Sequence, residues 1–461
     1  MSLLILHRAC YIIAVVMLMK IIQFGEGNFL RAFAEYYIQQ LKAAGTDIQV
    51  YVCQPRTNTK VINALKARQC RYDIIEKGLD NGCTVNRRVP VSCVSAALDT
   101  VTEYESIIGL FLDDDLKAVI SNVTEAGLLL DKAAVAEDFP HCCYSAKLTY
   151  LLYCRFSRGL APLIILPTEL SAPNGAILKS NVMYYARQWE YDSSFFGYIE
   201  RCTFCNTLVD RIVTGHDESD ADPCSVCCEP YYSLVIQAFA AEASLKKLLG
   251  SHEHVTFVET DEAFRSYCDR KLFLLNGVHT MITPAALLAG FTIVRDVVKD
   301  DLFSRFITLG LQELKACVAL SSDETDDFAE AVVERFANPY IDHQLTAIVT
   351  NSVSKFYYRD LRPILLYYRS YGTVAKALTF SLAALIVFYE DDERVNDDEK
   401  YQHIFTEHRG DIASYLNSKL LWNEDLSSVT GLQDFVKQYY LAIRQTGIKT
   451  AMEKLVYEAL A

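Results

Sequence analysis

The chain alternates two kinds of apolar pattern through its first half. Short runs rich in β-branched residues predict buried strands, and these runs are KIIQF from Lys20, IQVYVC from Ile48, KAVISN from Lys117, PLIILP from Pro162 and HVTFVE from His254. Helical patterns lie between them, such as FLRAFAEYYIQQLKAAG, which ends at Gly45 as a helix C-terminus should. Alternation of buried strand and helix predicts a parallel sheet covered by helices on both faces.

The second half of the chain has a different pattern, because strand patterns disappear after about residue 260. Helical periods, separated by acidic loops such as YEDDERVNDDEK, cover 261–320, 325–358, 373–389 and 431–459. A chain of 461 residues is also too long for one ordinary core. We therefore expect an α/β domain with a parallel-rich sheet over residues 1–260, followed by a mainly α-helical domain over residues 261–461.

An apolar extension, residues 1–19, precedes the first predicted strand. Its length suits a signal peptide or a membrane anchor. Against export, Arg8 lies within the apolar run, no small-residue cleavage site follows, and the next residues enter a strand and a glycine turn. We expect a segment packed beside the first strand, no membrane association and a cytoplasmic protein.

Composition and charge narrow the class of function. The chain is 51% hydrophobic and 22% charged, which is typical of a folded globular protein. Its net charge of −14 opposes a polyanionic partner, and its basic clusters, such as Arg87-Arg88, are short, so nucleic-acid binding is disfavoured. Fifteen cysteines, odd in number and scattered, indicate a reduced, intracellular protein. A small-molecule substrate fits these properties, which leave the oligomeric state open.

Four of the cysteines have the spacing of a zinc site. Cys202, Cys205, Cys224 and Cys227 form C-x₂-C-x₁₈-C-x₂-C, which suits tetrahedral Zn²⁺. The intervening NTLVDRIVTGHDESDADP joins an apolar, helix-like piece to an acidic loop, and a cysteine-rich chain contains CxxC pairs by chance. We favour reduced cysteines and predict no metal. A non-catalytic zinc-binding or regulatory protein is the alternative of a different class.

Polar residues interrupt an apolar helix in DRKLFLLNGVHT. At about 100° per residue, Asn276 lies about 140° and His279 about 80° around the helix from Lys271, so the three share one broad face. A snorkelling lysine and a hydrogen-bonded histidine at the edge of a surface helix would give the same pattern. Further along, His343 and Lys355 are twelve residues apart and cannot touch along one straight helix. Neither group identifies a site by itself.

IIQFGEGNFLRAF follows a strand and opens a helix. Gly25 and Gly27 permit a tight turn in which a pyrophosphate approaches the helix N-terminus, but Leu30 replaces the third glycine of the usual fingerprint. The second strand ends in VCQPRTN, without the acidic residue that grips a ribose 2′-hydroxyl, and Arg56 would suit a 2′-phosphate instead. The local sequence therefore leaves NAD and NADP both open.

Taken together, the motifs are similar to those of the polyol-type long-chain dehydrogenase/reductases, the mannitol dehydrogenase family, and above all to its tagaturonate reductase (altronate oxidoreductase) branch. The segments that carry the resemblance follow residue 19 in collinear order: IIQFGEGNFLRAF, QPR, SNVTEAG, AKLT, ILPTELSAPNG, FCNTLVDRIVTG, EPYYSLVIQ, RKLFLLNGVHT and ERFANPYIDHQL with NSVSKF. The resemblance implies a Rossmann-like N-terminal domain, a helical C-terminal domain with K-x₄-N-x₂-H, and hydride transfer between nicotinamide C4 and a sugar ketone or secondary alcohol without a catalytic metal.

The resemblance also implies roles for individual residues. Lys271 would be the general acid/base, Asn276 and Asn174 would donate to the developing oxyanion, and His279 would orient the substrate. Physical chemistry agrees, because ketone reduction needs a proton that a buried lysine can exchange near neutral pH, and neutral amides stabilise an alkoxide. The carboxylate of a hexuronate substrate needs a cationic partner, and the candidates are Arg335, His343 and Lys355.

Cofactor contacts and the substrate follow from the same resemblance. The residues implied in cofactor binding are Phe24, Gly25, Gly27, Asn28, Gln54, Arg56, Asn122, Thr124, Glu125 and Asp210. QPR departs from the acidic pattern of NAD-selective mannitol enzymes but resembles the tagaturonate branch, which the resemblance associates with NAD. We therefore expect NAD-dependent interconversion of D-tagaturonate and D-altronate, with a fructuronate reductase or a mannitol-type polyol dehydrogenase as the close alternatives.

Overall fold

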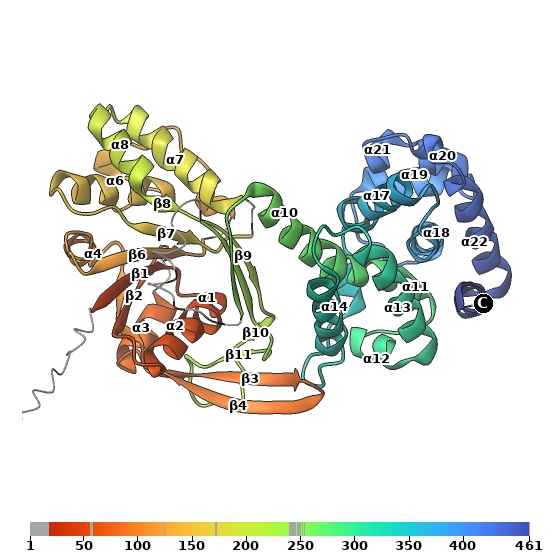
Figure 1. Cartoon of the computed structure of the whole chain (residues 1–461), viewed down its shortest axis with the longest axis horizontal. Helices are drawn as coiled ribbons and strands as arrows, with labels where there is room; N and C mark the ends of the chain where they lie inside the picture. The colour runs from red at the N-terminus through yellow and green to blue at the C-terminus, as the bar shows by residue number, and fades with distance from the viewer. Residues whose placement is uncertain are drawn as a thin grey trace, which may run out of the picture. The chain divides into compact units, whose positions relative to one another are not determined.

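The computed structural model describes residues 18–55, 59–123, 125–170, 173–238, 246, 250, 252 and 254–460 (Figure 1). These residues form two compact units, each assembled from separate parts of the chain. The first unit lies within Met1–Ile75, Arg88–Cys228 and Ser233–Glu259, and the second lies within Glu76–Arg87, Glu229–Tyr232 and Thr260–Ala461. Three parts of the predictions, residues 1–17 of the apolar extension, Arg56 and Thr124, lie outside the described residues.

In the described part of the first unit, a parallel sheet of six strands forms the framework. Its order is β5-β2-β1-β6-β7-β8, and every neighbouring pair is parallel. The strands are β1 (Met19–Phe24), β2 (Ile48–Gln54), β5 (Val94–Asp99), β6 (Leu116–Ser121), β7 (Ile164–Pro167) and β8 (Thr203–Phe204). This is the doubly wound order, in which the direction of strand addition reverses between β1 and β6, and the predicted Rossmann-like sheet is confirmed.

Helices pack against this sheet and share its core. They are α1 (Asn28–Ala32), α2 (Ala34–Ala43), α3 (Lys60–Ala67), α4 (Tyr104–Phe111), α5 (Glu125–Leu128), α6 (Tyr144–Ser157), α7 (Asn174–Gln188) and α8 (Ser193–Arg201), with a short 3₁₀ turn at Ala136–Asp138. Leu148 of α6 and Val182 of α7 are buried in one cluster with Ile165 of β7. The helix predicted to end at Gly45 does so, since Gly45 has φ +98°, but it is divided at Phe33 into α1 and α2.

Two smaller sheets contain the remaining described strands. In one, β12 (Ser233–Gln237) pairs antiparallel with β9 (Asn206–Asp210) and parallel with β13 (Val255–Val258), which is the predicted HVTFVE strand. The other has the order β10-β11-β3-β4, with β3 (Tyr72–Asp80), β4 (Cys83–Val91), β10 (Val213–Gly215) and β11 (Val226–Cys228). The β3–β4 hairpin was not predicted, although Asn81 and Gly82, both with positive φ, form a turn of the kind that closes such hairpins.

The part of the second unit that begins at Thr260 is helical, as the pattern after residue 260 predicts (green to blue in Figure 1). Most of α18 is buried, and it packs against α11 and α22 in the core of this unit. The helices are α10 (Asp261–Arg270), α11 (Val278–Leu288), α12 (Val294–Lys299), α13 (Asp301–Lys315), α14 (Ser322–Phe336), α15 (Leu345–Val349), α16 (Ser352–Phe356), α17 (Arg362–Tyr371), α18 (Lys376–Asp391), α19 (Glu399–Glu407), α20 (Ile412–Asn417), α21 (Lys419–Trp422), α22 (Leu432–Thr446) and α23 (Ile448–Leu460), with a 3₁₀ turn at Leu426–Ser428 and two π-helical segments, η2 (Lys271–Gly277) and η3 (Tyr357–Leu361).

The segment η2 joins α10 and α11 into one continuous helical stretch, Asp261–Leu288. Thr260 caps its start, because Thr260 Oγ1 accepts from the backbone N–H of Ala263 at 3.1 Å. Among the described helices this stretch alone is long and apolar enough to cross a membrane, but 78% of its apolar window is buried inside the protein. Such burial is typical of a core helix.

Candidate active site

The turn after β1 contains two glycines with different surroundings. Gly25 has φ +126°, and a Cβ there would lie 2.9 Å from Leu30 Cδ1 and 3.0 Å from the carbonyl oxygen of Asn122. Only glycine fits at this position, and Leu30 occupies the space beside it. A Cβ on Gly27, the N-cap residue of α1, would meet nothing within 4 Å. The turn is thus closed on the side of Leu30 and open at Gly27.

The carboxyl ends of β1, β6 and β7 are joined beside this turn. Asn122 donates from its backbone N–H to Phe24 O at 3.0 Å and from Nδ2 to Thr168 O at 2.6 Å. At the end of β2, the carbonyl of the buried Gln54 accepts from Thr100 Oγ1 at 2.6 Å. Because β1 lies between β2 and β6, these ends border the point where doubly wound sheets bind their ligands.

Lys147 is a buried cation near the end of β2. It lies in the motif AKLT but is not among the site residues predicted from the sequence. Its Nζ donates to Pro55 O at 3.1 Å, and burial lowers the pKa of Lys147. Arg56, the next residue after Pro55, is not described, and neither is the side chain of Glu125. The predicted cofactor contacts of these two residues stay predictions.

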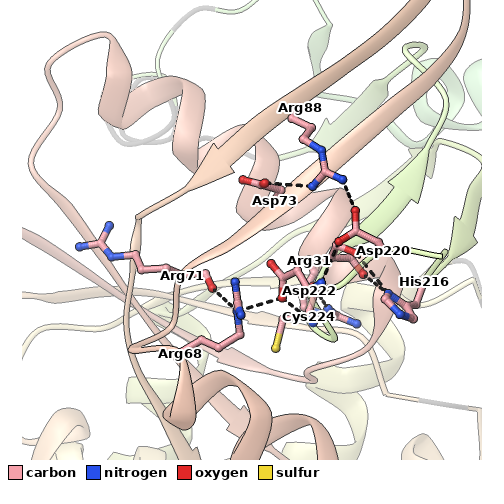
Figure 2. A network of polar contacts seen from close by, with 10 residues as sticks. Arg31, Arg68, Arg71, Asp73, Arg88, His216, Asp220, Asp222 and Cys224 are labelled. Carbon is pink, nitrogen blue, oxygen red and sulfur yellow. Dashed lines mark hydrogen bonds and ion pairs between the residues drawn. The ribbon is translucent and has the colours of Figure 1, made fainter. Parts of the chain in front are cut away.

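A polar network attaches the loop that contains Asp222 to α1 (Figure 2). Arg31 of α1 donates to Cys224 O, and its Nη2 donates to Asn28 Oδ1 at 2.6 Å. Asp222 pairs with Arg68 at 2.9 Å between Oδ1 and Nε, and Asp222 Oδ1 accepts from Cys224 N at 2.9 Å. Asn28, a predicted cofactor residue, is therefore oriented by Arg31 within the first unit.

Asp210, the predicted neighbour of the nicotinamide, is buried at the end of β9. The next residue, Arg211, donates from Nη1 to Ala32 O at 2.7 Å, and its guanidinium lies 4.2 Å from the centre of the Tyr36 ring. The end of β9 therefore lies beside the C-terminus of α1, the helix that follows the glycine turn. The predicted contact of Asp210 with the nicotinamide stays a prediction.

The four cysteines with zinc-like spacing are buried and lie at two different strands. Cys202 and Cys205 flank β8, whereas Cys227 lies in β11 and Cys224 just before it. In the ranges that the structure describes, no three His, Cys, Asp or Glu side chains gather into a group that could hold a metal ion. Burial raises the pKa of Cys202 to about 11 and that of Cys205 to about 12, so these two thiols are protonated near neutral pH.

Asn174 begins α7, and its amide is engaged within the first unit. Nδ2 donates to the carbonyl oxygens of Pro167 at 3.2 Å, Glu169 at 3.0 Å and Thr207 at 3.1 Å. Oδ1 accepts from the backbone N–H groups of Gly175 and Thr207, both at 2.9 Å. Asn174 can therefore donate to a substrate oxygen only in place of one of these carbonyls.

Lys271 and Asn276 both lie in the π-helical segment η2. Since π winding joins residue i to residue i+5, the five-residue spacing of Lys271 and Asn276 corresponds to about one turn. They lie closer to one face than the roughly 140° separation of an α-helix. Both side chains are half-buried, whereas His279, in the first turn of α11, is buried. The shared face was predicted, but the winding was not.

The second π segment, η3, packs against the first at Gly277. A Cβ on Gly277 would lie 3.1 Å from Arg359 O and 3.1 Å from Asp360 Oδ1. Arg359 Nη1 donates to Thr280 Oγ1 at 3.1 Å, and this hydroxyl donates to Asn276 O at 3.0 Å. The two π segments are therefore fitted to each other, and Arg359 is attached to the helix that carries the predicted catalytic residues.

Four side chains of the second unit form what we call the basic cluster: His279, His343, Lys355 and Arg359. The ring centroids of His279 and His343 are 4.9 Å apart. Burial, and then the charges of His343, Arg335 and Arg359, lowers the pKa of His279 well below its usual value. Burial and Lys355 lower the pKa of His343, and burial and Arg359 lower that of Lys355. Two neutral histidines thus lie among cations that repel one another.

Arg335, a predicted partner for the substrate carboxylate, has an internal partner. Its Nε donates to Glu229 Oε2 at 3.0 Å and its Nη2 to Glu229 Oε1 at 2.8 Å. The two side chains are only 3% and 1% exposed. Arg359 is a cation that was not predicted, although it lies four residues after Lys355 in SKFYYRD, on the same side of a helical turn.

Two models of known protein families match the chain. The mannitol dehydrogenase Rossmann domain matches residues 19–249, and the mannitol dehydrogenase C-terminal domain matches residues 263–444. The chain belongs to the mannitol dehydrogenase family. The resemblance inferred from the collinear motifs is thereby confirmed.

Two relatives named altronate oxidoreductase resemble the chain over nearly its full length. The chain is 34% identical to the altronate oxidoreductase of Bacillus subtilis (strain 168), over 94% of this chain and 95% of that protein. It is also 34% identical to the altronate oxidoreductase of Shigella flexneri serotype 5b (strain 8401), over 95% of this chain and 96% of that protein. The chain is an oxidoreductase, as the sequence predicts.

Two solved structures of dehydrogenases share the fold of this chain. Pseudomonas fluorescens mannitol 2-dehydrogenase, in a ternary complex with NAD and D-mannitol, is 19% identical with a TM-score of 0.68 over 96% of this chain and 95% of that one. D-sorbitol dehydrogenase in substrate-free form is 18% identical with a TM-score of 0.80 over 95% of both chains. At 18% and 19% identity, the likeness to these two structures shows a shared fold and nothing about the substrate.

Proposed function

We propose that the protein interconverts D-tagaturonate and D-altronate, with NAD as the hydride carrier, Lys271 as the general acid/base and no metal in the chemistry. The family and the altronate oxidoreductase relatives support a dehydrogenase that acts on a CH–OH group of a sugar acid or polyol. One observation favours the sugar acid over the polyol, and it is the basic cluster of the second unit.

The basic cluster suits an anionic substrate. Its members disfavour one another's charged forms. The pKa values of His343 and Lys355 are both lowered, first by burial and second by a neighbouring cation. A substrate carboxylate would relieve this repulsion and would suit the planar guanidinium of Arg359. A neutral polyol offers no such compensation. Because Arg335 is bound to Glu229, we assign the carboxylate to Arg359 with Lys355 and His343.

A dinucleotide fits the first unit, since the strand order is the doubly wound one and the turn is open at Gly27. The nicotinamide, when bound, supplies or accepts the hydride. We propose that Gly25 and Gly27 hold the diphosphate with Phe24 and Asn28 beside it, and that Gln54 and Arg56 hold the adenosine ribose. The remaining predicted contacts, to the nicotinamide half, are Asn122, Thr124, Glu125 and Asp210. The choice of NAD over NADP rests on the resemblance to the tagaturonate branch.

The residues of the second unit supply proton transfer and orientation. In reduction, Lys271 would give a proton to the substrate oxygen while the amide of Asn276 donates to the same oxygen. His279 is neutral because burial and nearby cations lower its pKa, so its ring can donate one hydrogen bond and accept another. Its Nε2 is buried and has no partner among the described residues, which makes it available to a substrate hydroxyl. Asn174 is the proposed second donor to the oxygen.

The decisive test follows NADH absorbance with purified protein and a panel of D-tagaturonate, D-fructuronate and D-fructose. We expect turnover with tagaturonate, lost by a factor of about 10² or more in Lys271→Ala. The exposed Lys299→Ala is the matched control and should keep full activity. Turnover of fructuronate alone would identify a fructuronate reductase, and turnover of fructose alone would contradict the sugar-acid substrate.

A further inference from the structure

Glu169 has a buried carboxyl at the carboxyl edge of the main sheet, and it is the second residue after β7. The residue is 4% exposed. Its Oε1 accepts from Ser121 Oγ at 2.8 Å and from Val123 N at 3.1 Å, both at the end of β6. Its Oε2 is buried and has no hydrogen-bond partner among the residues that the structure describes. Oε1 is therefore held by two hydrogen bonds. Burial of Oε2 without a hydrogen-bond donor costs free energy, which a ligand that contacts Oε2 would recover.

The position of Glu169 in the sheet indicates which half of a bound dinucleotide it would face. A doubly wound sheet consists of two mononucleotide-binding halves, and the half with the glycine turn and the end of the second strand takes the adenosine side. In this protein that half contains β1, β2 and β5. Glu169 belongs to the other half, between β6 and β7, and bonds to the end of β6 where that strand borders β1. It therefore lies on the nicotinamide side.

The groups that face Glu169 leave its charge uncompensated. Besides Ser121 and Val123, the titratable group beside it is the phenol of Tyr144 on α6, whose pKa is raised by burial and then by Glu169. No cation pairs with the Glu169 carboxyl in the described part of the chain. Burial raises the pKa of Glu169 to about 7, with the Val123 and Ser121 hydrogen bonds acting in the opposite direction. The carboxyl thus exchanges its proton near neutral pH.

We propose that Glu169 distinguishes the two redox states of the cofactor by changing its own protonation state. NAD⁺ has a positively charged nicotinamide ring, which favours an ionised carboxylate nearby, whereas the neutral ring of NADH leaves the carboxyl protonated. Binding of NAD⁺ to the protonated enzyme then yields ionised Glu169, bound NAD⁺ and one proton in solution. The inference rests on the proposed function, because it requires a nicotinamide cofactor in the first unit.

The proposal fixes the direction of the pH dependence. In the free enzyme, the ionised fraction of Glu169 rises from about one tenth at pH 6 to about nine tenths at pH 8 if its pKa is about 7. The affinity for NAD⁺ should therefore rise about tenfold over this range, because NAD⁺ binds the ionised form. The affinity for NADH should change by less than about twofold, since its binding leaves the pKa of Glu169 nearly unchanged.

The test counts protons with isothermal titration calorimetry at pH 6.5 in two buffers of different ionisation enthalpy. Wild-type protein should release most of one proton per NAD⁺ bound and almost none per NADH. Glu169→Gln should release none with either ligand and should bind NAD⁺ with an affinity that no longer depends on pH. Glu313→Gln is the matched control, because Glu313 is a half-buried glutamate of the second unit whose pKa desolvation also raises to about 7. It should retain the wild-type proton release.

The outcomes separate the two proposals. If neither NAD⁺ nor NADH binds, the proposed function fails. If both bind but wild-type protein releases equal numbers of protons with each, or if Glu169→Gln still releases the proton, the role of Glu169 is wrong. Circular dichroism checks that Glu169→Gln is folded, and if it is not, the wild-type comparison of NAD⁺ with NADH decides alone.

Discussion

Arg335 and Arg359 have the same charge, but their neighbours differ, and so do the expected effects of replacing them. Arg335 is paired with Glu229 through two hydrogen bonds, and both side chains are almost fully buried. Arg359 bonds to a neutral hydroxyl, Thr280 Oγ1, and its charge acts on the basic Lys355 and on the adjacent, buried Asp360, whose pKa burial raises well above its usual value. A change at Arg335 should therefore affect folding, whereas a change at Arg359 should affect the substrate.

Replacing Arg359 with methionine removes the guanidinium and keeps an unbranched apolar side chain. A hydrogen bond to a charged group is worth about 1.5 to 3 kcal/mol, so the KM for tagaturonate should rise about 10- to 100-fold. The measurement is steady-state kinetics with tagaturonate and with a tagaturonate methyl ester, which lacks the negative charge. An equal rise in KM for acid and ester would contradict the assignment of the carboxylate to Arg359.

Replacing Arg335 with leucine leaves Glu229 buried without its cation. Removing one partner of a buried ion pair costs about 3 to 5 kcal/mol of the free energy of unfolding. Urea denaturation should show this loss, and the double variant Arg335→Leu/Glu229→Leu should recover much of it because neither charge then remains. A single variant as stable as the wild type would show that the pair is unimportant for the fold.

At the scale of residues, the sequence identified groups with local patterns and missed partners from distant segments. Lys271, Asn276 and His279 stand within nine residues of one another, and a motif captures them. The pairing of Arg335 with Glu229 spans 106 residues, and no local pattern encodes it. For the same reason the sequence could not show that the amide of Asn174 is bonded to Thr207.

At the scale of elements, the two π segments meet where Gly277 leaves room for η3. Gly277→Ala would place a methyl group 3.1 Å from Arg359 O and Asp360 Oδ1, so the segments must separate. We expect a loss of about 1 to 3 kcal/mol in the free energy of unfolding, together with a lower kcat because Asn276 and His279 shift. Thermal unfolding and steady-state kinetics measure the two effects.

Gly197→Ala in α8 is the control for this substitution, because a Cβ there would meet nothing within 4 Å. An alanine at an unobstructed helical position should be neutral or stabilising by about 0.4 to 1 kcal/mol. If Gly277→Ala behaved like Gly197→Ala, the close packing of η2 on η3 would have no effect on stability.

Periodicity predicted the helical second half and four strands of the main sheet, β1, β2, β6 and β7, because burial repeats along each element. It did not predict the edge strands β5 and β8. It could not predict η2, since an apolar pattern of seven residues is compatible with both α and π winding. The β3–β4 hairpin was not predicted for a different reason. Its turn sequence, Asn81-Gly82 between two extended runs, is present in the sequence but was not used.

At the scale of the whole molecule, glutamates with raised pKa values make stability depend on pH. Glu313 accepts from the N–H groups of Ala377 and Leu378 at the start of α18, yet burial raises its pKa to about 7. A folded-state pKa above the unfolded one gives a contribution to stability that is complete below about pH 4.5 and is lost as the pH rises through about 7.

Glu313→Gln removes this titration but keeps a side-chain acceptor for α18. Relative to the wild type, the variant should gain on the order of 2 to 3 kcal/mol in the free energy of unfolding between pH 5 and pH 8. Urea denaturation at the two pH values measures this gain, with the exposed Glu262→Gln as the control. A difference between variant and wild type that is the same at both pH values would contradict the raised pKa.

The second unit includes Glu76–Arg87 and Glu229–Tyr232 as well as the C-terminal helices. Asn338 Nδ2 donates to Lys77 O at 3.1 Å, and Arg335 depends on Glu229. A helical fragment made by cutting the gene near residue 260 would therefore contain a buried arginine without its counter-ion. The C-terminal half cannot be exchanged between proteins as a self-contained module, and recombination would have to transfer three separate stretches of coding sequence together.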